Sequence, residues 1–143
     1  ALQGDPGRGK ALFLETEGVQ CKNCHQIGKS GTRLGPELTQ IGKKYTHSQL
    51  LESMLQPSKQ IDPKFVTWLV ETSEGQVHTG LLEEKTNTKV VLRNAQNGLV
   101  EIPAEQVDAL IPQRTSLMPD LLLREMTAQQ VADLLAYLAS LKE

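Results

Sequence analysis

Apolar residues recur at the three- and four-residue spacing of an amphipathic helix in three stretches of the chain. The first follows Asp5, a good N-cap, and Pro6, which suits the first helical position, so we predict a helix over residues 6–17. The second begins after Thr46 and the third after Thr127, and in each a glutamine three residues further on completes a capping box. The apolar stripes of these two helices are Leu50, Leu51, Met54 and Leu55, and Val131, Leu134, Leu135 and Leu138.

Between the second and third helices the pattern changes to the alternation that is typical of strands. Asn97-Gly98 is a strong signal for a tight hairpin turn, and Ser73-Glu74-Gly75 marks another turn. The segment from about 61 to 113 is therefore predicted to form an antiparallel β-meander or a small barrel, inserted into an otherwise helical chain, and the fold class is α+β. The predicted strands cover residues 65–70, 77–82, 89–93, 99–102 and 109–111.

Residues 18–45 follow neither pattern and contain five glycines. An irregular segment of this length is usually functional or wrapped around something. With 143 residues, the chain has the size of a single domain, in which we expect residues 1–60 and 114–143 to form the helical part and residues 61–113 the insertion. Aromatic residues make up only 3%, so the core must be filled by leucines or, in part, by a large flat apolar cofactor.

Charge is unevenly spread along the chain. The formal net charge of −2 divides into +3 for residues 1–60, −4 for residues 61–113 and −1 for residues 114–143. This balance is not that of a nucleic-acid-binding protein. No run is long and apolar enough to span a bilayer, and the chain begins without the apolar core of a signal peptide, which a mature or trimmed chain would have lost.

The strongest chemical signal is Cys21-Lys22-Asn23-Cys24-His25, the C-x-x-C-H motif of covalent haem attachment. Two intervening residues let both sulfurs reach the vinyl groups on one porphyrin edge, and His25 is then placed as an axial iron ligand. A disulfide between Cys21 and Cys24 and a zinc site are the alternatives. A thioredoxin-like motif would follow a strand, and a zinc site would need a second pair of soft ligands, whereas the chain has no other cysteine.

Five residues could supply the second axial ligand, and spacing alone does not decide among them. Met54 lies on an apolar helix stripe and Met126 just before the last helix, so both could be packing residues. His47 falls in the first turn of a helix and His78 on a predicted strand, where a solvated side chain is the plain interpretation. Met118 lies in a loop, from which a thioether could swing onto the open face of a haem.

Taken together, these features resemble class I cytochrome c. The matching features are the N-terminal helix with Gly9 and Phe13, the C-x-x-C-H motif, Gly35-Pro36 downstream, and a C-terminal helix with Leu134 and Tyr137. The resemblance implies that the terminal helices cross, with the glycine allowing close approach. It also implies that the carbonyl of Pro36 accepts a hydrogen bond from His25 and fixes its tautomer, and that Met118 is the distal ligand of one covalent haem c.

Residues 61–113 depart from that family, which has no β-meander between its middle helix and its methionine. In this respect the chain resembles a narrower group, the haem-binding domains described for planctomycetes and their relatives. The segments that carry this likeness are Leu55-Gln56-Pro57-Ser58, Ile61-Asp62-Pro63 and Ser116-Leu117-Met118-Pro119. Such domains often form the C-terminal part of larger proteins, so the resemblance implies a domain excised from one, working with a fused dehydrogenase domain or a separate redox partner protein.

We expect an electron carrier and not an enzyme, because iron with histidine and methionine ligands has no open site. The alternative is a haem enzyme, or a gas or peroxide sensor, in which Met118 is absent from the iron or easily displaced. Covalent haem attachment also predicts a periplasmic or otherwise extracytoplasmic location.

Two regions leave the function open. The basic residues near the motif form either an ordinary solvated surface or a basic rim that steers acidic partners. The insertion either packs Phe65 and Trp68 against the haem or the helices, or docks a partner domain through its eight acidic residues, or tunes the haem through Trp68. The basic residues are Lys22, Lys29, Arg33, Lys43 and Lys44.

Overall fold

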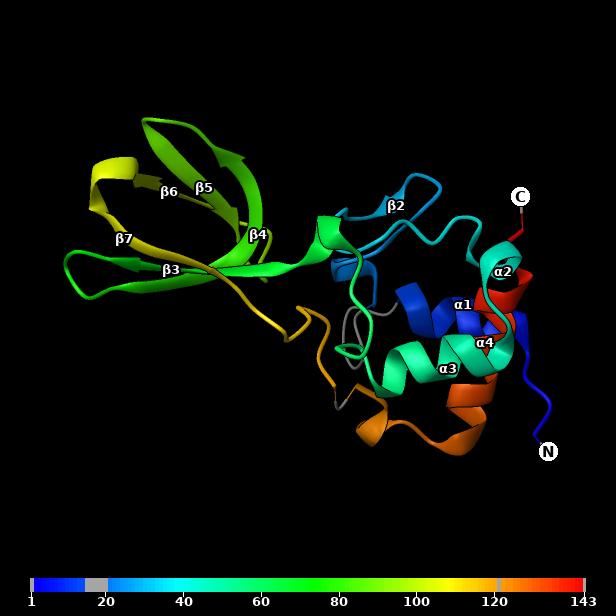
Figure 1. Ribbon diagram of the computed structural model, residues 1–143. Coiled ribbons are helices and arrows are strands. Elements are labelled where there is room, and N and C mark those ends of the chain that lie inside the picture. Colours follow the sequence, from blue (N-terminus) through cyan, green and yellow to red (C-terminus); the bar gives the residue numbers. More distant parts are fainter. Residues whose placement is uncertain (1, 15–20, 121, 143) are drawn as a thin grey trace. The chain divides into compact units, whose positions relative to one another are not determined.

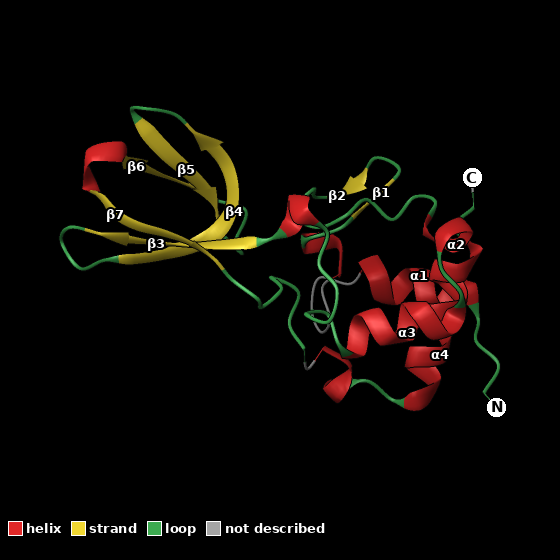
Figure 2. Cartoon of the chain, viewed as in Figure 1, coloured by secondary structure: helices red, strands yellow, loops and turns green. Residues whose placement is uncertain are grey.

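The computed structural model describes residues 2–14, 21–120 and 122–142, and the chain divides into two compact units. Residues 1–60 and 119–143 make up a unit in which helices dominate, and residues 61–118 make up a unit built on a sheet (Figures 1 and 2). The sheet unit ends at Met118, beyond the predicted end of the insertion at residue 113.

In its described residues, the helical unit contains four α-helices, a short hairpin and two 3-10 turns. They are α1 (Pro6–Leu14), η1 (Cys21–Asn23), β1 (Gln26–Ile27), β2 (Ser30–Gly31), α2 (Ile41–Lys44), α3 (His47–Leu55), η4 (Leu122–Glu125) and α4 (Ala128–Ser140). Both predicted capping boxes are present, at Thr46 and Thr127. The first helix begins at Pro6 as predicted, and residues 15–17 lie outside the described residues. The hairpin and α2 were not anticipated, because each is too short to show a period.

The helices α1 and α4 pack against each other, and α2 and α3 also contact α4. Gly9 makes the first of these contacts close: a Cβ at this position would lie 2.0 Å from the carbonyl oxygen of Asp133. Phe13 and Tyr137 are buried next to it, with ring centroids 6.0 Å apart. The close approach of the two terminal helices that the resemblance implies is therefore present, and it needs a residue without a side chain at position 9.

A buried carboxylate reinforces the same contact. The side chain of Asp133 accepts hydrogen bonds from Nε of Arg8 (2.9 Å), from the N–H of Asp5 (2.8 Å) and from Nε2 of Gln129 (2.9 Å). The hydrogen bond from Arg8 holds the pKa of Asp133 well below its usual range, and it outweighs the opposite effect of burial. The sequence around Asp133 reads as an apolar stripe, so this polar clamp between the terminal segments was not predicted.

The sheet unit contains five antiparallel strands in the order β6-β5-β4-β3-β7. All five predicted strands are present, the third with its predicted bounds and the other four with one or both ends shifted. However, β7 pairs with β3 and not with β6, so the sheet is not a simple meander. Alternation along a strand identifies the strand and says nothing about a partner that is distant in sequence. The elements are η2 (Pro63–Phe65), β3 (Thr67–Thr72), β4 (Val77–Lys85), β5 (Lys89–Arg93), β6 (Leu99–Pro103), η3 (Ala104–Gln106) and β7 (Val107–Pro112).

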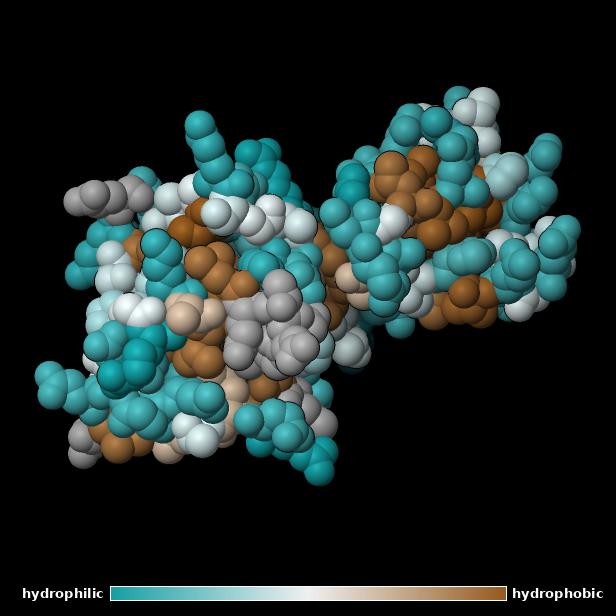
Figure 3. All heavy atoms as spheres, turned by 180° about the vertical axis from the view of Figure 1, so that it is seen from behind, coloured by the Kyte–Doolittle hydropathy of each residue, from teal (hydrophilic) through white to brown (hydrophobic). Residues whose placement is uncertain are grey.

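The sheet curls and encloses a core of its own (Figure 1). The register between β4 and β5 shifts between Leu82 and Glu84, and a β-bulge of this kind increases the local twist. Trp68 is half-buried and packs against the core of the sheet. Figure 3 also shows apolar side chains at the surface of this unit, where Val77, Leu99 and Ile111 are exposed. The core consists of Val70, Val90, Leu92 and Ile102.

Two buried threonines of β3 give a matched test of this unit. Among the residues that the structure describes, nothing bonds to the hydroxyl of Thr67, whereas the hydroxyl of Thr72 accepts the N–H of Gln76 at 3.0 Å. Thr67→Val removes an unsatisfied buried group, so the free energy of unfolding should stay the same or rise by about 1 kcal/mol. Thr72→Val leaves the N–H of Gln76 without that acceptor and should lower the free energy of unfolding by about 1–3 kcal/mol. Chemical denaturation followed by circular dichroism measures both, and equal losses would contradict the assignment of the Thr67 hydroxyl as unpaired.

Candidate functional site

The motif at residues 21–25 is folded as a tight turn. The carbonyl oxygen of Cys21 accepts the N–H groups of Cys24 and His25, at 3.1 and 3.0 Å. The element η1 therefore keeps the two cysteines one turn apart and brings His25 directly after them. This arrangement fits a group that is held by two thiols and one imidazole from a single short segment.

A second segment, residues 31–36, holds this turn, and we call it the clasp. The N–H of Thr32 donates to the carbonyl of Lys22 at 3.2 Å, and the N–H of Gly35 donates to the carbonyl of Cys24 at 2.6 Å. Leu34, between these two contacts, is only 2% exposed. The clasp is thus anchored by a buried side chain, and its two backbone hydrogen bonds hold the motif in place.

The imidazole of His25 is oriented by the last residue of the clasp. Its Nδ1 lies 2.7 Å from the carbonyl oxygen of Pro36. A carbonyl oxygen can only accept, so Nδ1 carries the proton, and Nε2 keeps its lone pair for a ligand. The hydrogen bond that the resemblance implied for Pro36 is therefore present, and its effect is to select the tautomer that binds a metal through Nε2.

Gly35 contributes to this orientation through the side chain that it lacks. A Cβ at position 35 would lie 2.8 Å from Cε1 and 3.1 Å from Nδ1 of His25, so the ring rests on the bare backbone. The sequence indicated Gly35 only as half of a Gly-Pro pair. A glycine immediately before the accepting proline was the available signal for its role.

The protonation of the motif suits metal binding by the imidazole. Burial lowers the pKa of His25, and the hydrogen bond to Pro36 opposes this shift only in part. The ring is therefore neutral at pH 7, the form that ligates a metal. Burial raises the pKa of the Cys24 thiol, and no disulfide joins it to Cys21. The raised pKa favours the protonated thiol of Cys24 over a reactive thiolate.

The candidates for a second axial ligand are spread over both units. In the helical unit, Met54 is buried in α3, Met126 is half-buried just before α4, and His47 is exposed at the start of α3. In the sheet unit, His78 is half-buried on β4, and the N–H of Met118 donates to Oγ of Ser116 at 3.1 Å. His25 and Met118 belong to different units, and ligation by Met118 stays a prediction.

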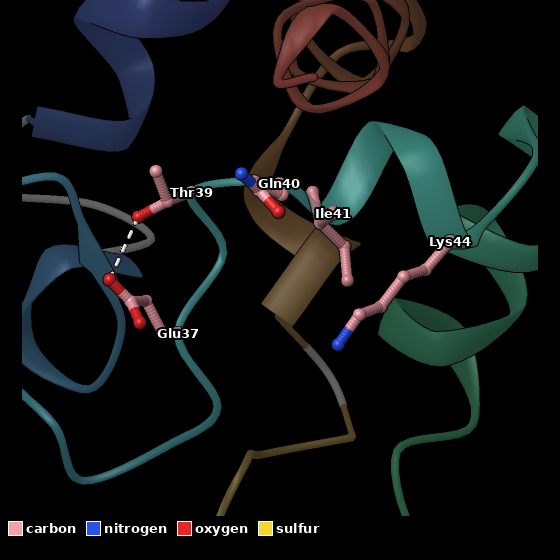
Figure 4. A pocket seen from close by; sticks show the side chains of 5 residues that line it. All are labelled: Glu37, Thr39, Gln40, Ile41 and Lys44. Atoms are coloured by element: carbon pink, nitrogen blue, oxygen red, sulfur yellow. Dashed lines mark hydrogen bonds between the residues drawn. The ribbon is translucent and has the colours of Figure 1, made fainter. Parts of the chain in front are cut away.

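A polar cavity of about 350 Å³ follows the clasp in the chain (Figure 4). The hydroxyl of Thr39 donates to the carboxylate of Glu37 at 3.0 Å and accepts the N–H of Gly28 at 2.8 Å, while the Lys44 side chain reaches in from α2. Neither the cysteines nor His25 line this cavity. It is therefore a neighbouring feature of the helical unit and does not define the site of the motif.

The model of the cytochrome c family matches residues 7–142. A comparison with curated proteins finds no match to the chain. Across the described residues, no three His, Cys, Asp or Glu side chains converge as a metal-ligand cluster. None of the described helices has the length and apolar character needed to cross a bilayer.

The residues present fit a covalently attached haem c. Cys21 and Cys24 would hold the group through thioether bonds, and His25 would bind the iron through Nε2. The fit rests on the packing of the imidazole against the bare backbone of Gly35, where a Cβ would collide with the ring, and on the neutral tautomer that Pro36 selects.

Gly35→Ala should disturb the histidine ligand. The added Cβ must displace the imidazole or the clasp, so we expect the free energy of unfolding to fall by about 1–3 kcal/mol and the electron paramagnetic resonance g values of the ferric protein to change.

Gly28→Ala is the control for this experiment. Unlike Gly35, Gly28 has a positive φ, of 59°, and a Cβ there meets nothing within 4 Å. It should cost about 1–2 kcal/mol through backbone strain and leave the g values unchanged. If both variants left the iron spectrum untouched, Gly35 would have no part in orienting the ligand.

Proposed function

Since the chain belongs to the cytochrome c family, we propose that it is a monohaem electron-transfer domain with His25 and Met118 as the axial ligands of the iron. The observation that carries this proposal is the hydrogen bond from Nδ1 of His25 to the carbonyl of Pro36, together with the close packing of Gly35 on the ring. Both contacts hold the His25 ring in one orientation, whatever the oxidation state of the iron. A ligand that does not move between oxidation states suits a carrier, whose two states should have nearly the same structure.

The haem supplies the one-electron chemistry, and a thioether ligand favours ferrous iron and raises the potential. The chain has three tasks around it. Cys21 and Cys24 hold the group covalently, the clasp keeps His25 in place, and the buried leucines and Phe13 keep water from the interior. With two protein ligands there is no open position for oxygen or peroxide, which supports electron transfer over an enzymatic role.

Met118 is the distal ligand in this proposal, on the strength of its place in the Ser-x-Met-Pro segment. Met54 is only 7% exposed and fills the apolar face of α3, so it is engaged in packing. His47 is exposed at a helix start, on a surface position. The same segment supports membership of the narrower group of haem-binding domains with a Ser-x-Met-Pro motif.

Partners and location follow from the cofactor. We propose a redox partner protein or a fused dehydrogenase domain as the electron donor or acceptor, and a periplasmic or otherwise extracytoplasmic site, where haem is attached to such motifs. Lys29 and Arg33 are exposed close to the motif in sequence, which supports a basic surface that attracts an acidic partner.

Met118→Ala tests the ligand assignment. The oxidised wild-type protein should show the weak long-wavelength absorption band of a methionine–iron bond, and Met118→Ala should lose it. The reduction potential should also fall, because the ligand that favours ferrous iron is gone.

Met126→Ala provides the matched control, because Met126 is also a half-buried methionine close to the start of α4. It should keep the band. A band that survives in Met118→Ala and disappears in Met126→Ala would transfer the role to Met126, and a wild-type protein without the band would support the sensor or enzyme alternative.

A further inference from the structure

A second cavity, of about 340 Å³, lies in the helical unit where the chain passes from α2 to α3 and meets the end of α4. It is an open hollow at the surface, because the polar side chains that line it are exposed. Neither cysteine and no part of the clasp lines it. Its polar side chains are Lys43, Lys44, Tyr45, Thr46, His47 and Lys142.

The chemistry of this wall is one-sided. Each of these six side chains can donate a hydrogen bond, the ammonium groups of Lys43 and Lys142 line this cavity alone, and no carboxylate of the described residues lines it. A wall of donors and positive charges complements a ligand made of acceptors and negative charge. A cationic ligand would be repelled by these ammonium groups.

Ion pairs do not neutralise the lysines of this wall. Within the described residues, the ion pairs made by lysines involve Lys59 and Lys89. Within the described part of the chain, neither Lys43 nor Lys142 has an ion-pair partner. Like charges gathered on one cavity repel each other, and a bound anion would remove that cost.

The backbone holds the two sides of the cavity together. The N–H of Gly42 donates to the carbonyl of Leu141 at 2.8 Å, and a Cβ at position 42 would lie 2.3 Å from the carbonyl oxygen of Ala139. This contact places Lys43 and Lys142, which are distant in sequence, on one rigid junction. Lys44 stands between the two cavities, and its side chain reaches toward the neighbouring one (Figure 4).

We propose that this junction of α2, α3 and α4 is a binding site for a small phosphate-type oxyanion, separate from the haem. Lysine binds phosphate as a point charge, and several lysines approaching from different elements suit the several oxygens of a phosphate or diphosphate group. The site does not depend on which residue is the distal iron ligand.

Calorimetric titration of the haem-loaded protein with sodium pyrophosphate, at an ionic strength held constant with sodium chloride, tests the proposal. The expected result is saturable binding of one pyrophosphate. Lys43→Gln and Lys142→Gln should each weaken it about tenfold, because each removes a charge-assisted hydrogen bond. An unchanged haem spectrum shows that the variants are folded.

The control is the double variant Lys10→Gln/Lys29→Gln, which changes the net charge as much as Lys43→Gln/Lys142→Gln does, at exposed positions away from the cavity. It should bind pyrophosphate as the wild type does. If pyrophosphate binding were weakened equally in the two double variants, the effect would be one of overall charge, and the proposed site would be wrong. The site would also be wrong if the titration showed no saturable binding. Binding to vesicles of anionic phospholipid without binding of pyrophosphate would also overturn it, because the anion would then be a membrane headgroup.

Discussion

The hydrogen bond between Nδ1 of His25 and the carbonyl of Pro36 is the constraint on which the functional part of this molecule depends. It decides which nitrogen of the ring is free, and so decides that the motif presents a metal ligand. The bond forms only because the clasp runs along residues 21–25 and because Gly35 leaves the ring room. The clasp in turn is held by Leu34, which is buried in the core of the helical unit. The orientation of the iron ligand His25 therefore depends on the packing of the core.

The closure of the helical unit has the same character, because it too depends on a missing side chain. Gly9 lets α1 approach the backbone of α4, and Asp133 then joins the two terminal segments through Arg8. The N-terminal helix and the C-terminal helix therefore stabilise each other directly, although more than a hundred residues separate them. The sheet unit has a core of its own around Val70 and Leu92.

The features that were predicted from the sequence are those that depend on a few neighbouring residues. Cys21, Cys24 and His25 are readable because their spacing carries the chemistry, and the capping boxes at Thr46 and Thr127 are complete within four residues. The features that were missed depend on partners distant in sequence. The pairing of β7 with β3 and the hydrogen bonds of Asp133 leave no mark on neighbouring positions. The role of Gly35 lies between these cases, since the residue was conspicuous but its contact with the His25 ring is made only in three dimensions.

The central claim is that the iron of this cytochrome c has two protein ligands and no open position, so that the domain carries electrons and does not bind small molecules at the metal. The most direct measurement is the visible absorption spectrum of the reduced protein before and after exposure to carbon monoxide. We predict no change for the wild type, with Met118→Ala, in which the position is opened, as the positive control. A carbon monoxide spectrum in the wild type would contradict the claim and would identify the domain as one with an accessible iron.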